Sequence, residues 1–401
     1  MRFLRVLGIV VLIVVILAVV QVVRGAPAPT VSLRSTQETV SGARPSLPWP
    51  STGEAAVAVQ GIGTMGSYGG NAPMPIGSVA KVMTALLVLE KHPLTLGQQG
   101  PSLTMTQADV QTYQQEAATQ QSYVAVAAGE KLTEYELLQG LLVPSGNNFA
   151  QILAQWVGGS QAKFVQMMNA KAKALGLTRT TYADASGLSP ATVSSAQDQL
   201  KLATVAMQNP VFAQIVAQPQ VALPSPEGLV YNYNKEIGHI IGQDTVIGVK
   251  TGSTLAAGGC YVFAMQRNIG GQNVIVYGAV FGAGTTLPLD TAISEGIGLG
   301  KAALDGVHPV QVLASGSGVG QISAPWQASV GVNAGSSVQF YGWGGLRIQT
   351  QLLPKALKAP VAAGVTVGTL RVQIGDQTAK VPVKAAGAVS APPLRWRLLR
   401  F

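Results

Sequence analysis

The stretch PIGSVAKVMTALLVL, residues 75–89, decides the fold of the larger part of this chain. Pro75 and Gly77 predict that a helix begins near Ser78. The run that follows is apolar on nearly every face, which is typical of a helix buried in a domain interior. Ser78 and Lys81 occupy positions i and i+3, so they share one face of that helix. A serine and a lysine are therefore predicted to meet at the first turn of a buried helix.

This pair suits nucleophilic catalysis, because a serine hydroxyl is a weak nucleophile and needs a base within hydrogen-bond reach. Lys81 can be that base if burial or nearby positive charge makes its ammonium easier to deprotonate. The apolar helix supplies the burial, and Lys250 can supply the charge. The pattern alone is weak, since Ser160 and Lys163 repeat it. Ser160 follows two glycines and is predicted to cap an amphipathic helix instead.

A second motif, Ser145-Gly146-Asn147, occurs once in the chain. It comes directly after Pro144, which ends the helical pattern before it, so the motif is predicted to lie in a turn between two helices. There it would deliver one hydroxyl and one carboxamide into a cleft.

The third motif, Lys250-Thr251-Gly252, also occurs once, after the β-branched run of residues 245–249. That run is typical of a buried strand. Lys250 and Thr251 suit a substrate that ends in a carboxylate, by charge and by hydroxyl donation. Gly252 would let a substrate backbone approach the strand closely.

These three motifs, in this order, resemble those of the serine penicillin-binding family. More closely, the chain is similar to low-molecular-mass D-alanyl-D-alanine carboxypeptidases of the penicillin-binding protein 5 type. The departures are modest: Ala80 stands where a threonine is frequent, and Asn148 where an aspartate is frequent. The likeness covers about residues 53 to 388 and includes the segments 78–90, 174–177, 186–188, 194–198, 232–234, 357–364 and 367–370.

The resemblance implies an α+β fold of the penicillin-binding and β-lactamase-like transpeptidase type, a sheet plus a helical region, followed by a small all-β domain. It implies a serine-type carboxypeptidase that removes the terminal D-alanine from peptidoglycan stem peptides and is acylated by β-lactam antibiotics. No cofactor is implied. The implied catalytic residues are Ser78, Lys81 and Ser145, and the implied substrate-binding residues are Asn147, Lys250, Thr251, Gly252 and Ser253. Ser78 would carry the acyl group, and the backbone N–H groups of Ser78 and Ser253 would form the oxyanion hole.

Two alternatives remain open on the sequence. A β-lactamase or related esterase could use the same fold, but class A β-lactamases place a deacylating glutamate between the second and third motifs. The glutamates in that interval are Glu227 and Glu236, and neither has the expected Glu-x-x-Leu-Asn context. A catalytically silent wall-binding protein is the other alternative, and it is disfavoured because every chemical group of the site is present.

Composition fits two domains, since 401 residues of which 47% are hydrophobic can build one large core and a second, smaller one. Cys260 is the one cysteine, which excludes an intrachain disulfide, and it is predicted to be a small buried residue in a strand. The three histidines are scattered without metal-ligand spacing, so no metal site is expected. The net charge of +9 comes from dispersed residues without a nucleic-acid motif, so no nucleic-acid partner is expected.

The N-terminus predicts a membrane helix. Arg2 and Arg5 precede the apolar run 6–23, and Arg24 follows it. We expect an uncleaved anchor with Met1 in the cytoplasm and the enzyme on the extracytoplasmic face of a bacterial membrane. The alternative is a cleaved signal peptide, although the small-residue pattern 26–28 is followed by a proline, a poor residue after a cleaved bond.

The predicted organisation has five segments. Residues 1–24 are the anchor or signal peptide, and 25–52 are a flexible linker rich in Pro, Ser, Thr and Gly. Residues 53–305 are the catalytic domain, with helical patterns from 78 to about 206 and strands at 55–59, 246–263 and 274–280. Residues 306–388 alternate as short strands of an all-β domain. The basic and apolar tail 389–401 is predicted to be either a second membrane contact or a disordered end.

Overall fold

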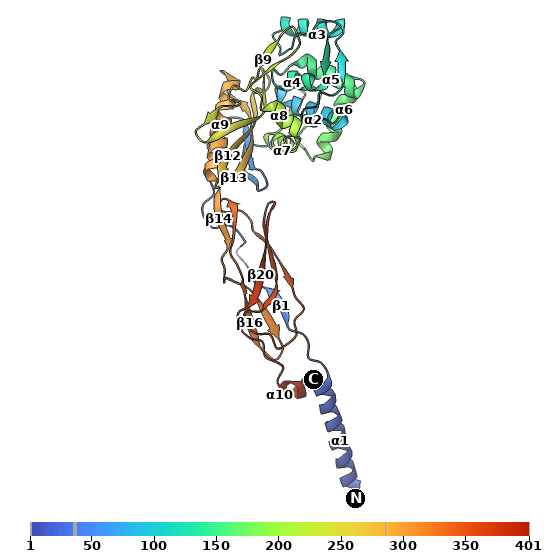
Figure 1. The fold of residues 1–401 in the computed structure, drawn as a ribbon, viewed down its shortest axis with the longest axis vertical. Helices are drawn as coiled ribbons and strands as arrows, with labels where there is room; N and C mark the ends of the chain where they lie inside the picture. Colours follow the sequence, from blue (N-terminus) through green and yellow to red (C-terminus); the bar gives the residue numbers. More distant parts are fainter. Residues whose placement is uncertain (1, 35–37, 285, 401) are drawn as a thin grey trace. The chain divides into compact units, whose positions relative to one another are not determined.

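The computed structural model describes residues 2–34, 38–284 and 286–400. Its chain divides into two compact units, residues 45–306 and a second unit made of residues 1–44 with 307–401 (Figure 1). Met1 and Phe401, residues 35–37 of the predicted linker, and residue 285 of the predicted catalytic domain lie outside the described residues.

The unit of residues 45–306 contains one large antiparallel sheet and a helical region, as the α+β prediction requires. The sheet has the order β10-β11-β12-β13-β2-β3. Its strands are β10 (Ile240–Ile241), β11 (Asp244–Thr254), β12 (Gly258–Ile269), β13 (Gln272–Ala283), β2 (Glu54–Val59) and β3 (Gly63–Tyr68). Helix α9 (Pro288–Gly306) packs on β12 and β13, and α7 (Ala196–Ala206) packs on β13 and β2. The prediction of a mixed domain with one main sheet is confirmed.

The helical region surrounds α2 (Lys81–Lys91), which packs against five other helices. Every residue from 82 to 89 is buried, because α2 has neighbours on all sides. The other helices of the region are α3 (Gln107–Ala118), α4 (Glu134–Leu142), α5 (Asn147–Gly158), α6 (Gln161–Ala174) and α8 (Pro210–Val216). Three two-stranded ladders complete the unit: β4 (Met74–Pro75) with β7 (Val193–Ser194), β5 (Ser102–Thr104) with β6 (Lys131–Thr133), and β8 (Gln220–Ala222) with β9 (Leu229–Tyr231).

The helix that carries the serine–lysine pair begins slightly differently from the prediction. Residues 77–80 form a 3-10 turn, η1 (Gly77–Ala80), and the α-helix starts at Lys81. A 3-10 turn has three residues per turn, so side chains at i and i+3 eclipse one another. This geometry brings Ser78 and Lys81 closer together than an α-helical turn would.

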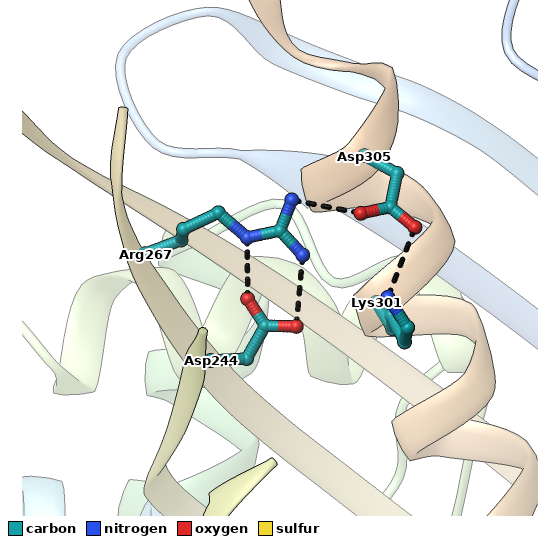
Figure 2. Close-up of polar contacts among 4 residues, drawn as sticks. All are labelled: Asp244, Arg267, Lys301 and Asp305. Carbon is teal, nitrogen blue, oxygen red and sulfur yellow. Dashed lines mark hydrogen bonds and ion pairs between the residues drawn. The ribbon is translucent and has the colours of Figure 1, made fainter. Parts of the chain in front are cut away.

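A cluster of ion pairs connects β11 to β12 and α9. The guanidinium of Arg267, on β12, donates from Nε and Nη2 to both carboxylate oxygens of the buried Asp244, at 2.6 and 2.9 Å. Its Nη1 donates to Asp305 of α9 at 2.7 Å, and Asp305 also accepts from Lys301 at 3.2 Å. Figure 2 shows the guanidinium between the two carboxylates. Bidentate bonds of this kind fix geometry and add stability. They hold the start of β11 in place against β12 and α9.

The second unit is mostly β structure. Its main sheet has the order β1-β15-β16-β20-β19-β18, and β14 pairs with β17. The strands are β1 (Thr30–Leu33), β14 (His308–Leu313), β15 (Gly318–Ala324), β16 (Gln327–Ala334), β17 (Val338–Gly342), β18 (Gln349–Pro354), β19 (Thr366–Ile374) and β20 (Gln377–Ala385). The all-β character expected beyond about residue 306 is confirmed for residues 308–385.

Part of the predicted flexible linker is a strand of this unit. Residues 30–33 form β1, which pairs antiparallel with β15, and Val40 is buried and donates its N–H to Leu346 at 2.8 Å. Composition suggested a tether because Pro, Ser and Gly dominate the segment. The short run TVSL still has β propensity, and the edge of β15 offers it backbone partners.

Both ends of the chain are helical within the described residues. Helix α1 (Arg2–Val23) contains the stretch Phe3–Val23, which is long and apolar enough to cross a membrane by length and composition. Helix α10 (Leu394–Leu399) occupies the tail, where Trp396 packs edge-on against Trp326 with ring centres 5.4 Å apart. The guanidinium of Arg400 donates to the backbone carbonyls of Gln21, Arg24 and Gly25. The tail is therefore packed beside the end of α1.

Candidate active site

Lys81 lies at the centre of the polar groups that the three motifs bring together. Its side chain is fully buried at the start of α2. The Nζ atom lies 2.7 Å from Ser78 Oγ, 2.7 Å from Asn147 Oδ1 and 3.4 Å from Ser145 Oγ. It also donates to the backbone carbonyl of Ser186 at 3.2 Å. The first and second motifs therefore converge on one amine.

The turn that carries the second motif is as predicted. Helix α4 ends at Leu142, α5 begins at Asn147, and Ser145 between them has a positive φ of 65°. A positive φ is uncommon for a residue with a side chain, and the surrounding structure must stabilise it. The Asn147 N–H donates to the Ser122 carbonyl at 2.8 Å, and its Nδ2 donates to Gln121 Oε1 at 3.2 Å. These bonds leave Asn147 Oδ1 facing Lys81.

The third motif lies inside strand β11, whose residues pair with β12 from Thr245 to Thr254. Lys250 and Thr251 are buried, at 2% and 3% exposure, whereas Ser253 is exposed. The Lys250 Nζ donates to the carbonyl of Thr251 at 3.1 Å. Burial lowers the pKa of Lys250 well below its usual value, and the charge of Lys81 lowers it further. The two lysines therefore lie close enough to influence each other's protonation.

The structure shows why a glycine occupies position 252, which the sequence did not reveal. A Cβ atom at this position would lie 2.7 Å from the Ile76 carbonyl oxygen, 2.9 Å from Ser78 N and 3.0 Å from Val79 N. Strand β11 therefore passes directly against the backbone of the η1 turn. A Cβ on Gly77 would likewise lie 3.1 Å from Ser253 N. The N–H groups of Ser78 and Ser253 are therefore both located where the backbones of η1 and β11 meet.

The electrostatics of the site favour a neutral lysine. Burial lowers the pKa of Lys81 from 10.5 to about 7, although the carboxylates of Asp184 and Glu116 both act to raise it. Asp184 is held by the hydroxyl of Ser186 at 2.7 Å and the hydroxyl of Thr192 at 2.5 Å. A lysine with a pKa near neutrality can accept a proton under physiological conditions, which an exposed lysine cannot do.

A cleft of about 440 Å³ opens over this cluster. Ser78, Asn147 and Ser253 line it, while Lys81, Ser145, Lys250 and Thr251 are buried. The other residues that line it are Thr119, Gln120, Gln121, Ser122, Gly187, Leu188, Pro190, Thr254, Leu255 and Ala256. The nucleophile candidate is thus open to a substrate while its base candidate is shielded from water.

Some residues of the site were not identified from the sequence. Glu116 and Gln121 are distant from every motif along the chain, and no pattern in the sequence points to them. Asp184 precedes the segment 186–188, which was recognised for its likeness to the family and not for its chemistry. Its contacts with Ser186 and Thr192 become visible in three dimensions.

The other sequence interpretations can be checked directly. Ser160 caps α6, and its hydroxyl accepts from the Lys163 N–H at 3.3 Å, so the structural interpretation of this second Ser-x-x-Lys pattern is confirmed. Cys260 is fully buried in β12, and burial raises the pKa of its thiol to about 12. Within residues 2–34, 38–284 and 286–400, no group of three or more His, Cys, Asp or Glu side chains is arranged to hold a metal ion.

Comparison with known proteins identifies the family. The family model described as D-alanyl-D-alanine carboxypeptidase matches residues 67–285. The chain is 37% identical over 224 residues to the D-alanyl-D-alanine carboxypeptidase DacB2 of Mycobacterium tuberculosis, covering 54% of this chain and 71% of that protein. It is 33% identical over 224 residues to a D-alanyl-D-alanine carboxypeptidase of Streptomyces sp., covering 53% and 73%.

Solved structures agree in fold. The Streptomyces K15 DD-transpeptidase superposes with a TM-score of 0.54 at 25% identity, over 66% of this chain and all of that one. Penicillin binding protein 5 of Haemophilus influenzae superposes with a TM-score of 0.58 at 18% identity, over 90% of this chain and all of that one, and supports the fold alone. The chain therefore belongs to the D-alanyl-D-alanine carboxypeptidase family, and it is a serine peptidase that shares the fold of penicillin-binding protein 5.

Proposed function

We propose that this enzyme removes the terminal D-alanine from peptidoglycan stem peptides through an acyl-enzyme on Ser78. The single observation that carries the proposal is the position of the Lys81 amine, 2.7 Å from the hydroxyl of Ser78 and shielded from solvent. A positioned base with a pKa near the working pH is what a serine nucleophile requires.

In the acylation step, Ser78 Oγ attacks the carbonyl carbon of the penultimate D-alanine while its proton passes to Lys81 Nζ. The negative charge that develops on the carbonyl oxygen is stabilised by the backbone N–H groups of Ser78 and Ser253. The close approach of η1 and β11 at Gly252 supports this pairing. As the C–N bond breaks, Ser145 relays the proton held by Lys81 to the amine of the leaving D-alanine, so that Lys81 becomes neutral again.

Deacylation repeats the same chemistry with water as the nucleophile. Lys81 accepts a proton from the water, the water oxygen attacks the ester carbon, and Ser78 recovers its hydroxyl proton as the ester bond breaks. Asn147 orients the substrate amide from the opposite side of the cleft, because its carboxamide is held by Gln121 and Lys81. Thr251 favours a substrate carboxylate by hydroxyl donation, and a bound carboxylate would favour the charged form of Lys250, whose pKa is lowered by burial.

Penicillins present a carboxylate and a reactive amide, so they are proposed to acylate the same serine. We further propose that α1 anchors the enzyme to a bacterial membrane, with the catalytic unit on the extracytoplasmic side where stem peptides occur. The length and apolar composition of Phe3–Val23 support an anchor, and they fit a signal sequence as well.

The experiment that tests the function is incubation of the enzyme with a peptide ending in L-Lys-D-Ala-D-Ala while released D-alanine is measured. We expect release by the wild-type enzyme and none by the variant Ser78→Ala. In parallel, mass spectrometry after penicillin labelling should map the adduct to Ser78. An adduct on Ser160, or penicillin hydrolysis without D-alanine release, would overturn the assignment, and the second result would favour a β-lactamase.

A further inference from the structure

The first turn of α5, which presents Asn147 to Lys81, has no capping side chain of its own. Its N-cap residue is Gly146, so the backbone N–H groups of the first turn need partners from elsewhere. The carboxylate of Glu116, on α3, supplies one: its Oε2 accepts from the Asn148 N–H at 2.9 Å. Its Oε1 accepts from the Gln151 side chain at 2.9 Å, one turn further along α5.

The same residue also fixes the other side of Asn147. The backbone carbonyl of Glu116 accepts from the Gln121 N–H at 2.9 Å, which shapes the turn after α3. The Gln121 side chain in turn accepts from Asn147 Nδ2 at 3.2 Å. Two chains of hydrogen bonds therefore lead from Glu116 to Asn147, whose Oδ1 lies 2.7 Å from Lys81 Nζ.

Glu116 is buried, at 4% exposure of the residue. A negative charge is favourable at the N-terminus of a helix, which offsets part of the cost of burying it. Burial raises the pKa of Glu116 to about 7, and the Asn148 bond and the charge of Lys81 act to lower it. The other charged groups that face Lys81 are Asp184, from the loop before β7, and Lys250, from β11.

We propose that Glu116 is a positioning residue of the active site: it holds the first turn of α5, and with it Asn147, against Lys81, and its charge contributes to the pH at which Lys81 can accept the Ser78 proton. This inference rests on the proposed function, in which Lys81 is the base. Glu116 does not line the cleft, so it acts through Asn147 and Lys81 and not on the substrate.

The test is the pH dependence of acylation by a fluorescent penicillin, measured from about pH 5 to 9, where the base titrates. Glu116→Gln retains the size and the acceptor oxygen for Asn148 but removes the charge. Without that charge the Lys81 ammonium is less stabilised, so Lys81 is neutral at lower pH. Because burial raises the pKa of Glu116 itself to about 7, its charge acts on Lys81 in the upper part of the acidic limb, and we expect that part of the profile to move to lower pH. An acidic limb at the wild-type pH would overturn the role of the charge.

A second variant separates geometry from charge. Glu116→Asp keeps the charge, but the aspartate side chain is shorter. It cannot contact Asn148 and Gln151 at the same time as closely as glutamate does. We expect the acylation rate to fall at every pH by about tenfold, because a displaced Asn147 misaligns the reacting groups, while the acidic limb stays near its wild-type pH. A wild-type rate for this variant would overturn the positioning role. This arm also remains decisive if Glu116→Gln fails to fold.

The matched control is Glu134→Gln. Glu134 is fully buried at the start of α4, and burial raises its pKa to about 7, as for Glu116. Within the described residues its carboxylate oxygens make no hydrogen bond to α5. Its substitution should leave the acidic limb in place, and a shift equal to that of Glu116→Gln would overturn the specific role of Glu116. If the proposed function itself fails, the wild-type enzyme will release no D-alanine from the peptide or will form no adduct on Ser78, and either result differs from all of these.

Discussion

The Nζ atom of Lys81 lies 2.7 Å from the Oγ atom of Ser78, although Lys81 is fully buried and Ser78 faces the cleft. The contact joins a buried amine to a hydroxyl that a substrate can reach. The 3-10 turn η1 eclipses positions i and i+3, which brings the two side chains to the same face of the turn. The proposed acylation step requires that amine to be neutral.

The variant Lys81→Arg tests the proposed base. A guanidinium stays protonated at any pH at which the protein is folded, so it cannot accept the seryl proton. We expect acylation by penicillin to fall by about 10² to 10⁴-fold, the usual contribution of a general base. The measurement is the rate at which a fluorescent penicillin labels each enzyme in the same buffer. Acylation at the wild-type rate would remove Lys81 from this role and point to Ser145.

The lowered pKa of Lys81 also predicts how stability depends on pH. The group titrates near 7 in the folded chain and at 10.5 in the reference state, so between these values the unfolded chain binds more protons. Stability contributed by this residue therefore rises with pH across that window and is lowest below pH 7. Urea unfolding at a series of pH values measures it. Lys81→Met, which cannot titrate, should show a smaller rise, and an equal rise in both proteins would contradict the prediction.

The buried pair Lys250 and Thr251 predicts a preference for a free carboxylate at the end of the substrate. A peptide with an amidated C-terminus loses a charged hydrogen bond, so its apparent barrier should rise by about 2 kcal/mol or more. The measurement is kcat/KM for the acid and amide forms of one peptide. Thr251→Ala should discriminate less between them, because part of the group that senses the carboxylate is gone. Equal turnover of both peptides by the wild-type enzyme would favour an endopeptidase or esterase with an open cleft.

Gly252→Ala tests the contact between β11 and the η1 turn. The added methyl group would meet the backbone of Ile76, Ser78 and Val79 within 3.0 Å, so one of the two segments must shift. We expect acylation to slow by about 10- to 100-fold, because small displacements of a nucleophile are costly. The control is Gly298→Ala in α9, where a Cβ meets nothing within 4 Å and helix propensity improves by up to about 1 kcal/mol. Equal rates for the two variants would contradict the prediction.

Much of the fold could be predicted from local patterns. The apolar run after Lys81 predicted a buried helix, Pro144 predicted the break before α5, and Ser160 was predicted to cap a helix; the structure confirms all of these features. The alternating runs beyond residue 306 gave strands. Each of these features depends on residues within a few positions of one another, where helix and strand periodicity governs which side chains share a face.

The site was predicted in a more limited way. Ser78 and Lys81 could be paired from their spacing, because one turn of helix joins them. That Ser145, Asn147 and Lys250 belong to the same site followed from a family resemblance, since no local rule connects residues so far apart in the chain. Their proposed roles stay predictions, to be checked by the experiments above.

By itself the sequence determined most of the helices and strands of the catalytic unit, the order of the motifs and the chemistry available to them. Only the tertiary structure decided which distant groups meet: Glu116 with Asn148, Gln121 with Asn147, Gly252 with the backbone of η1, and β1 with β15. The physical reason is that these contacts join segments whose relative positions are fixed by the packing of whole helices and sheets. The pKa of Lys81 is decided in the same way, because burial by five neighbouring helices, and not its position in the sequence, makes its charged form unfavourable.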